Sequence, residues 1–321
     1  MRYSNNALNV LTALTFKGVG RAWIVKNIGT ESPDITEIVN LLNTLKNKKE
    51  EITVELFEDK KKQILRVIHD NAPYIDGVVA IGDPDFPQHR GNVKNSDRPV
   101  FLFYKGDISL LQTNNHNITV IGLLNPDNEI ESTEKAIISK LVEQNITIIS
   151  GLALGCDTIA HEQTLICGGK TIAILPSPLA SILPSSNKTL AEGIVKRGGL
   201  LVTEYLTGAK SKTMLTSRYQ ERDRLQALFS DGIILSASYA ENDKGNDSGS
   251  RLAMQYAQKY SIRRALIYDE GFADNPKFDL NRQYISEDRN ITVLNKKNHS
   301  TRLKEWFSER AIYNQPSLFG L

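Results

Sequence analysis

The stretch Ile148-Ile-Ser-Gly-Leu-Ala-Leu-Gly-Cys-Asp-Thr-Ile-Ala-His161 decides the fold of this chain. A short apolar run, typical of a buried strand, leads into a turn with Gly151 and Gly155, and a helical pattern begins near Asp157. Glycine lets the backbone approach a ligand closely, and the amides at a helix N-terminus carry partial positive charge. The stretch therefore predicts a strand, a turn and a helix that together bind an anion, typically phosphate. The alternative interpretation is structural, because any tight connection of this kind favours glycine.

Two polar side chains on the predicted helix have structural interpretations. Asp157 stands where the helix begins, so we expect its carboxylate to be the N-cap. His161 follows one helical turn later and has no nucleophile or carboxylate partner close to it in the sequence. We therefore expect His161 to pack in the interior rather than to take part in chemistry.

The same alternation of strands and helices extends on both sides of this stretch. It predicts an α/β fold with an extended Rossmann-like, mostly parallel sheet and helices on both faces, because parallel strands need helical crossovers. Ligands of such sheets bind at the carboxyl ends of the strands. The predicted strands are Val78–Ile81, Val100–Tyr104, Ile118–Gly122, Ile146–Ser150, Thr171–Leu175, Leu200–Glu204, Gly232–Ser236, Ala265–Tyr268 and Ile291–Leu294. The predicted helices are Thr133–Gln144, Thr158–Cys167, Leu190–Arg197, Glu221–Phe229, Ser250–Tyr260 and Thr301–Ser308.

The two ends of the chain have a different character. Apolar residues at helical spacing predict a small helical module over residues 1–76, followed by the Rossmann-like domain over 77–310 and a tail over 311–321. The turn that contains Gly18 and Gly20 is similar to a helix-hairpin-helix turn, and the module as a whole to SAM or helix-hairpin-helix modules. Such a turn can hold a DNA phosphate.

Composition excludes several classes of protein. The 321 residues include 40% hydrophobic and 24% charged side chains, which is ordinary for a globular chain and excludes wholesale disorder. No apolar run has the length of a membrane span, the first residues contain no signal peptide, and two cysteines are too few for a disulfide framework or a four-ligand zinc site. We expect a cytoplasmic protein with no membrane contact.

The charge balance alone argues against nucleic acid, since 39 basic and 37 acidic side chains leave a net charge of +2. The distribution of charge changes that interpretation. Lys210–Arg224 holds five basic against two acidic side chains, with Tyr219 between them, and leads into a helix. Such a basic strip suits a nucleic-acid backbone, although pairing of its arginines with Glu221 and Asp223 at the surface would explain it as well.

A third candidate is the polar loop Asn242–Arg251, which follows a predicted strand and precedes a helix. Ser248, Gly249 and Ser250 offer hydroxyls and amides to an anion, and turn or capping duty is the alternative. The sequence contains no Ser/His/Asp arrangement, no His/Cys cluster with metal spacing and no Walker loop. We therefore predict no catalytic residues, no metal and no cofactor.

Several motifs, taken in order, resemble the DNA-processing protein DprA (Smf) family, whose phosphate turn reads Ser-Gly-Leu-Ala-x-Gly-Ile-Asp. The order of the motifs makes a chance match improbable. The resemblance rests on Gly82–Pro87, Arg98–Leu111, Ser150–His161, Gly168–Leu175, Leu183–Asn187, Leu201–Tyr205, Arg222–Asp231 and Ser248–Ser250.

The resemblance implies a non-enzymatic Rossmann-like protein that binds single-stranded DNA, forms a homodimer and passes the strand to a RecA-type recombinase in natural transformation. The residues that it implies along the strand path are Gly151, Leu152, Ala153, Gly155, Lys170, Arg218, Arg222, Arg224, Ser248, Gly249 and Ser250, with Gly18 and Gly20 as a further phosphate turn.

Two departures from the family pattern indicate a divergent member. The family's first loop reads Gly-Ser-Arg, whereas this chain reads Gly122-Leu-Leu-Asn125, so one charge-assisted phosphate contact is missing. The chain after Tyr268 is also too short for the family's C-terminal winged helix. A role in DNA-directed defence is therefore as consistent with the sequence as one in DNA uptake or recombination.

The tail gives a separate indication. Gln315-Pro-Ser-Leu-Phe319 resembles the short bacterial peptide that binds the replicative sliding clamp, with Gln315 leading and Leu318 and Phe319 filling a pocket. The alternative is a tail that packs these apolar side chains on its own domain.

Two other functions compete with DNA binding. The anion-binding edge could serve a nucleotide sensor, which the missing arginine favours because a mononucleotide presents fewer phosphates than a strand. LOG-type nucleotide hydrolases resemble the chain in fold, but their Pro-Gly-Gly-x-Gly-Thr-x-x-Glu motif is absent from the sequence.

Overall fold

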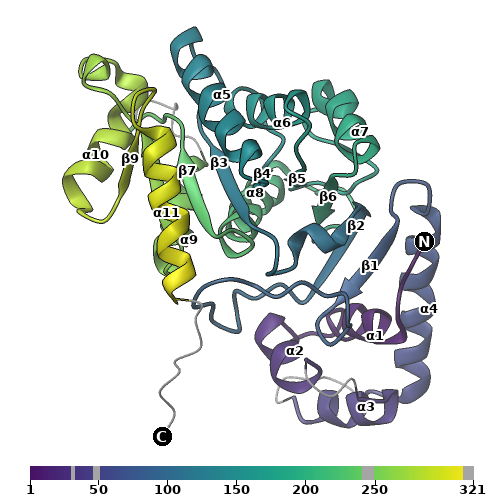
Figure 1. The fold of residues 1–321 in the computed structure, drawn as a ribbon. Coiled ribbons are helices and arrows are strands. Elements are labelled where there is room, and N and C mark those ends of the chain that lie inside the picture. The colour runs from purple at the N-terminus through teal and green to yellow at the C-terminus, as the bar shows by residue number, and fades with distance from the viewer. Residues whose placement is uncertain (30–32, 46–50, 241–248, 314–321) are drawn as a thin grey trace, which may run out of the picture.

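The computed structural model describes residues 1–29, 33–45, 51–240 and 249–313, with side chains as far as Trp306. These residues form one nine-stranded sheet in the order β1-β2-β6-β5-β4-β3-β7-β8-β9 (Figure 1). Seven strands, from β6 to β9 in that order, are parallel, and β2 and β1 continue the sheet antiparallel. The strands are β1 (Gly77–Ala80), β2 (Phe101–Gly106), β3 (Asn117–Ile121), β4 (Thr147–Ser150), β5 (Thr171–Ile174), β6 (Leu200–Thr203), β7 (Gly232–Leu235), β8 (Arg263–Ile267) and β9 (Thr292–Leu294).

Helices cover both faces of the sheet, as the sequence predicts, because the apolar strands must be buried on each side. One face packs against α5, α6 and α11, and the other against α8, α9 and α10. The helices of this part are α5 (Asn128–Glu143), α6 (Cys156–Ile166), α7 (Lys188–Lys196), α8 (Lys212–Leu228), α9 (Ser250–Lys259), α10 (Asp279–Glu287) and α11 (His299–Tyr313). The predicted fold class and all nine predicted strands are confirmed.

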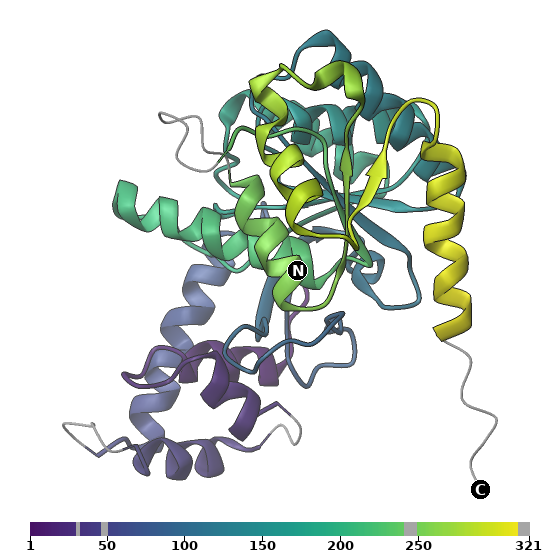
Figure 2. The ribbon, with the colours of Figure 1, turned by 90° about the vertical axis from the view of Figure 1, so that its left-hand side faces the viewer.

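Helix α8 begins nine residues earlier than the predicted start at Glu221. Its first turns carry little apolar periodicity, so the sequence pattern did not reveal them. Ser211 caps this end, where its hydroxyl accepts a hydrogen bond from the amide of Met214 at 3.1 Å. The N-terminal half of α8 projects from the body of the protein (Figure 2), which leaves its side chains around Lys212 exposed.

Two C-terminal helices also differ from the prediction. Helix α10 was not predicted, because six of its nine residues are polar and only Leu280, Tyr284 and Ile285 are apolar or aromatic. Helix α11 extends through Tyr313, past the predicted end at Ser308 and past the start of the predicted tail at residue 311. None of the helices in the described residues combines the length and apolar character that crossing a bilayer requires.

The N-terminal part is helical, as predicted, and packs around Phe57, whose ring stacks on Phe16 at a centroid distance of 5.9 Å. Arg21 ties it to the rest of the protein through ion pairs with Glu221 at 2.7 Å and Glu204 at 3.4 Å. Its helices are α1 (Asn5–Ala13), α2 (Arg21–Asn27), α3 (Ile35–Asn43) and α4 (Val54–Asp70). The domain boundaries at residues 76 and 310 stay predictions.

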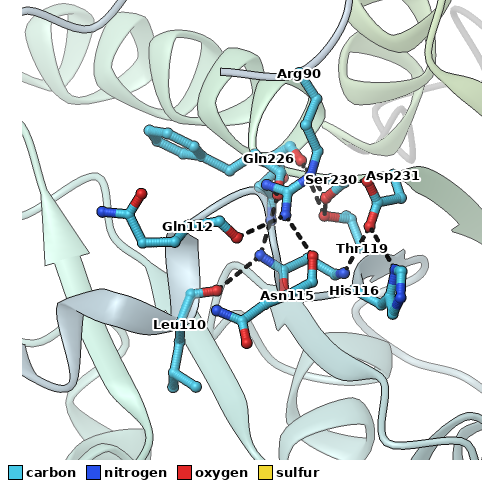
Figure 3. A network of polar contacts seen from close by, with 11 residues as sticks. Arg90, Leu110, Gln112, Asn115, His116, Thr119, Gln226, Ser230 and Asp231 are labelled. Carbon is cyan, nitrogen blue, oxygen red and sulfur yellow. Dashed lines mark hydrogen bonds and ion pairs between the residues drawn. The ribbon is translucent and has the colours of Figure 1, made fainter. Parts of the chain in front are cut away.

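A buried arginine fixes the long segment 82–100, which has neither helix nor strand (Figure 3). Arg90 Nε donates to Asp231 at 2.8 Å, and Nη1 donates to the carbonyl of Phe229 at 2.6 Å. Its Nη2 donates to the carbonyls of Gln112 and Asn115 at 3.2 and 2.8 Å. Asp231 directly precedes β7, so this network closes the amino-terminal edge of the parallel strands.

Candidate nucleic-acid interface

The turn between β4 and α6 lies at the carboxyl edge of the parallel strands, where the topology predicts a ligand site. A pocket of about 350 Å³ opens there between the end of β3, the start of α6 and the middle of α8. Its lining consists of Ile121, Gly122, Leu124, Ala153, Leu154, Asp157, Pro184, Tyr219, Arg222, Asp223, Gln226, Gly249 and Ser250.

Two glycines of the turn are required by close approaches. Gly155 has φ +73°, and a Cβ there would lie 2.2 Å from the carbonyl oxygen of Leu123. A Cβ on Gly151 would lie 1.3 Å from Nη1 of Arg222, so only glycine leaves room for this guanidinium. Asn187 fixes the turn by donating a hydrogen bond from its side-chain amide to the carbonyl of Leu152 at 2.9 Å. The turn therefore connects β4 to α6 tightly and also leaves room for the guanidinium of Arg222.

Asp157 is not the N-cap of α6, so that prediction was wrong. Gly155 occupies the cap position, and Asp157 lies buried in the first turn. Its Oδ2 accepts hydrogen bonds from the amides of Gly151 at 3.1 Å and Ala153 at 3.2 Å. Two of the amides predicted to bind phosphate are thus occupied by the protein itself. Within the described residues, the amides of Leu154 and Gly155 have no acceptor.

Arg222 lies at the centre of the pocket wall and is 7% exposed. Its Nε is 3.0 Å from Asp223 Oδ1 and its Nη1 is 3.8 Å from Asp157 Oδ2, and neither contact has the geometry of a hydrogen bond. The guanidinium carbon also lies 5.6 Å from the centre of the Tyr219 ring. Nearly all buried polar groups in proteins have hydrogen-bond partners, so two buried N–H groups without a partner in the described structure indicate a site for an acceptor.

The two carboxyl groups beside Arg222 are unusually basic. Burial raises the pKa of Asp223 to about 7, with Arg222 opposing this shift and Asp157 adding to it. Burial also raises the pKa of Asp157, against the stabilising effect of Arg222 and of the amides that bind it. Perturbed carboxyl groups of this kind gather at functional sites.

Arg224 was predicted to contact DNA, and its position contradicts this. It is 2% exposed, and its Nη2 forms an ion pair with Glu204 at 2.5 Å while its Nη1 donates to the carbonyl of Asp97. Helical spacing explains the difference from Arg222, because residues two apart on a helix point to different sides. Arg224 links α8 to the segment after β6.

Lys170 and Arg218 occupy different surfaces. Lys170 precedes β5 and therefore lies at the amino edge of the sheet, away from the pocket, where its Nζ donates to the carbonyl of Arg197 at 2.7 Å. Lys170 does not line this pocket, and its contact with DNA stays a prediction. Arg218 lies over the Tyr205 ring at 4.2 Å and donates to the carbonyl of Thr207 at 2.7 Å. It is half-buried on the projecting part of α8, one helical turn before Arg222.

The polar loop is represented by Gly249 and Ser250, which both line the pocket. Gly249 is the N-cap of α9, and the Ser250 hydroxyl donates to the carbonyl of Gly122 at 3.0 Å. Ser248 lies outside the described residues, as do Gln315, Leu318 and Phe319 of the predicted clamp-binding peptide.

Gly18 and Gly20 precede α2 and do not line the pocket. Gly18 has φ +91°, which favours glycine, and Gly20 is the N-cap of α2. The next residue, Arg21, forms the ion pairs that connect this module to the sheet. The role of the glycine turn toward DNA stays a prediction.

A buried polar cluster beneath the pocket was missed at the sequence level. Glu134 on α5 is fully buried and faces the Cys156 thiol and the Ser236 hydroxyl, and burial raises its pKa to about 8. The two carboxyl oxygens have no hydrogen-bond partner within the described residues. Because the three residues come from separate elements, no local pattern brings them together.

His161 packs in the interior, as predicted. It is fully buried, its Nδ1 lies 2.7 Å from the Thr171 hydroxyl, and burial with some help from Arg222 lowers its pKa to about 3. It is neutral at physiological pH. The described side chains contain no group of three or more residues suited to hold a metal ion.

The sequence is similar to proteins of known families. A model of the family described as DNA recombination-mediator protein A matches residues 77–301. Protein Smf from Synechocystis is 28% identical over 181 residues, which cover 56% of this chain and 42% of that protein. DNA processing protein DprA from Streptococcus pneumoniae is 35% identical over 141 residues, or 44% of this chain and 47% of that protein. The matches thus span less than half the length of these relatives.

Solved structures support the same fold. The X-ray structure of DprA from Streptococcus pneumoniae aligns with a TM-score of 0.69 at 21% identity, covering 95% of this chain and 98% of that one. A structure of DNA processing protein A from Helicobacter pylori, described for its mode of binding single-stranded DNA, aligns with a TM-score of 0.54 at 24% identity, over 69% of this chain and 98% of that one. With the family match over most of the chain, the protein belongs to the DNA recombination-mediator protein A family, also called DprA or Smf.

Proposed function

We propose that this protein binds single-stranded DNA and catalyses no reaction on it. One phosphate of the strand would bind at the pocket between the β4–α6 turn and α8. The observation that carries the proposal is Arg222, a buried guanidinium at the carboxyl edge of the sheet, two of whose nitrogens find no acceptor in the part of the chain that the structure describes. Membership of a DNA-processing family supports the same assignment.

The surroundings of Arg222 suit a phosphodiester strand. A phosphate at the pocket would accept charge-assisted hydrogen bonds from Arg222. The amides of Leu154 and Gly155, on the turn between β4 and α6, would be further donors. The projecting part of α8 extends the basic surface through Lys212 and Arg218, and aromatic rings such as Tyr219 can stack on bases. The strand would therefore run from the pocket along α8.

Affinity should be modest and sensitive to salt, because few cations of the described residues face the strand. Leu124, which is 59% exposed at the pocket, stands where the family's Gly-Ser-Arg loop has arginine, and Arg224 is held in the interior. Each lost phosphate contact reduces both affinity and its dependence on salt concentration.

The test is fluorescence anisotropy with a labelled oligothymidylate at low salt. Arg222→Gln should weaken binding about tenfold or more, as loss of a charge-assisted hydrogen bond does. Arg302→Gln is the matched control, because Arg302 is exposed on α11 and pairs only with the neighbouring Glu305 among the ion pairs described. Equal affinities of the Arg222→Gln variant and the wild type would contradict the proposal.

A nucleotide ligand is the second candidate, favoured by one observation. Asp157 occupies two turn amides, which leaves a pocket of about 350 Å³ with donors for a single phosphate. Thermal-shift measurements with nucleoside monophosphates and with oligonucleotides separate the two functions. Stabilisation by nucleotides alone would favour the sensor. Release of free base from a nucleotide would instead support a LOG-type hydrolase.

The biological setting is also a proposal. In this scheme the protein acts as a homodimer in DNA uptake, recombination or DNA-directed defence and passes its strand to a RecA-type recombinase. The tail peptide with Gln315, Leu318 and Phe319 would bind the sliding clamp, and Gly18 and Gly20 would add a phosphate contact. Light scattering tests the dimer, and a pull-down with purified recombinase or clamp tests each partner.

A further inference from the structure

The charge of the pocket depends on one proton. Among the described residues, the charged groups that face Asp223 are Arg222 on the same helix and Asp157 on α6, while α9 contributes the neutral Gly249 and Ser250. With both carboxyl groups ionised, the three side chains carry a net negative charge, which repels a phosphate. With one carboxyl group protonated their sum is zero, and the positive guanidinium can attract the phosphate.

The two carboxyl groups differ in their hydrogen bonds. Asp157 accepts two backbone N–H groups at 3.1 and 3.2 Å, and such bonds favour the ionised form. Asp223 has a close ion pair with Nε of Arg222 at 3.0 Å, and it is 2% exposed. A phosphate bound to Arg222 would place a second negative charge beside Asp223 and weaken its ion pair with the guanidinium. The carboxyl group that must give way to an anion is therefore Asp223.

We propose, on the basis of the proposed function, that phosphate binding at this pocket is coupled to the uptake of one proton by Asp223. The proton comes from solvent, bonds to a carboxylate oxygen of Asp223 and returns to solvent when the phosphate leaves. The phosphodiester brings one negative charge into the pocket and the proton brings one positive charge. The total charge of the pocket therefore stays the same when the phosphate binds. Arg222 exchanges a carboxylate partner for a phosphate partner.

The direction of the pH dependence follows from the protonation equilibrium. In the unbound protein, burial raises the pKa of Asp223 to about 7, and a bound anion raises it further because it disfavours the carboxylate. Affinity is therefore highest where Asp223 is already protonated, below about pH 6. It falls as the pH rises through 7 and becomes constant above the pKa of the bound state. His161 stays neutral throughout this range.

Oligothymidylate without terminal phosphates is the appropriate probe, because a phosphodiester does not titrate in this range whereas a phosphomonoester has a second pKa near 6. Its affinity is measured by anisotropy from pH 6 to 9 at constant ionic strength. The wild type should lose at least about tenfold in affinity across this range, since one linked proton changes binding by up to tenfold per pH unit. Calorimetry at pH 7.5 in two buffers of different ionisation enthalpy should show proton uptake on binding.

Asp223→Asn imitates the protonated form. This variant should bind at pH 8.5 as tightly as the wild type binds at pH 6 and should show no pH dependence. Glu134→Gln is the control for the other carboxyl group with a strongly raised pKa, and Asp59→Asn, on the exposed surface of α4, is the control for net charge. Both controls should keep the wild-type pH profile.

Three outcomes separate the inference from the proposed function. Binding with the same affinity from pH 6 to 9, without proton uptake, overturns the inference and leaves the proposed function standing. A pH profile that disappears in Glu134→Gln but persists in Asp223→Asn overturns the assignment to Asp223. Absence of binding at every pH contradicts the proposed function and the inference with it. Calorimetry uses the wild type, so the inference remains testable even if Asp223→Asn does not fold.

Discussion

Arg90 and Arg222 are equally buried, each 7% exposed, yet they lie at opposite edges of the sheet and their surroundings differ. At the amino edge, every nitrogen of the Arg90 side chain donates to Asp231 or to a backbone carbonyl (Figure 3). At the carboxyl edge, two nitrogens of Arg222 have no hydrogen-bond partner among residues 1–29, 33–45, 51–240 and 249–306. The first arrangement stabilises the fold, and the second is prepared for a ligand. Burial alone does not distinguish these roles, whereas the count of hydrogen bonds does.

The largest effect is expected from Arg90→Ala. It leaves Asp231 buried without its arginine and removes a charged donor from three backbone carbonyls, so the free energy of unfolding should fall by about 3–5 kcal/mol. The Phe229 and Gln112 carbonyls keep a second donor, from the Asn117 side chain and the Asn115 amide. Urea denaturation measures this loss. At low temperature, the folded Arg90→Ala variant should bind oligothymidylate with the same affinity as the wild type. A loss below about 1 kcal/mol would remove the contrast between the two arginines.

Arg224→Gln should also act on stability rather than on binding. It breaks a buried ion pair with Glu204, which should cost about 3 kcal/mol, at the lower end for such pairs because Arg21 remains close to Glu204. Denaturation gives the stability, and anisotropy of the folded fraction gives the affinity. Weaker DNA binding at unchanged stability would return Arg224 to the strand path.

Glu134→Gln should change how stability depends on pH. The carboxyl pKa of Glu134 is about 8 in the folded protein, well above its ordinary value of 4.5, so the folded state holds this proton more tightly than the unfolded state does. The wild type therefore loses stability relative to the variant as the pH rises from about 5 to 8, and the difference is constant above that. Melting temperatures of both proteins from pH 5 to 9 test this. A difference that does not vary with pH would mean that Glu134 is ionised throughout.

The smallest effect is expected from Leu124→Arg, which introduces an exposed cation at the mouth of the pocket. Affinity for oligothymidylate should rise a few-fold at low salt, and the slope of log affinity against log salt should steepen by about 0.7, the value for one more single-strand phosphate. Leu154→Arg adds a cation at another exposed position of the pocket, on the turn between β4 and α6, where Leu154 is 48% exposed. Its affinity and salt slope are compared with those of Leu124→Arg. Unchanged affinity and slope in Leu124→Arg would place the strand elsewhere.

The sequence was sufficient for the sheet but not for the roles of its arginines. Strands such as β4 are continuous apolar runs bounded by turn residues, so a local pattern identifies them. Arg222 and Arg224 are two residues apart on one helix, and no local pattern assigns one to the pocket and the other to the interior. Their roles depend on Asp157, in α6, and Glu204, just after β6, which the tertiary fold brings close to α8.

The site was likewise only half predictable. The turn after β4 was identified from its glycines, because their spacing reflects a local backbone requirement. That Asp157 occupies two of the turn amides, and that Asp223 is a buried acid rather than an interruption of a basic strip, follows only from the tertiary contacts. The projecting start of α8 escaped prediction because hydrophobic periodicity is a signal of burial, and this segment is exposed.

The most direct test of the contrast between the two arginines is the affinity of Arg222→Gln for oligothymidylate at pH 6 and low salt, measured beside its free energy of unfolding. We predict that affinity falls about tenfold or more while stability falls by less than in Arg90→Ala, because at this pH Asp223 is protonated and Asp157 keeps its two backbone N–H donors. Unchanged affinity together with a loss of stability like that of Arg90→Ala would contradict the account and make Arg222 a second structural arginine.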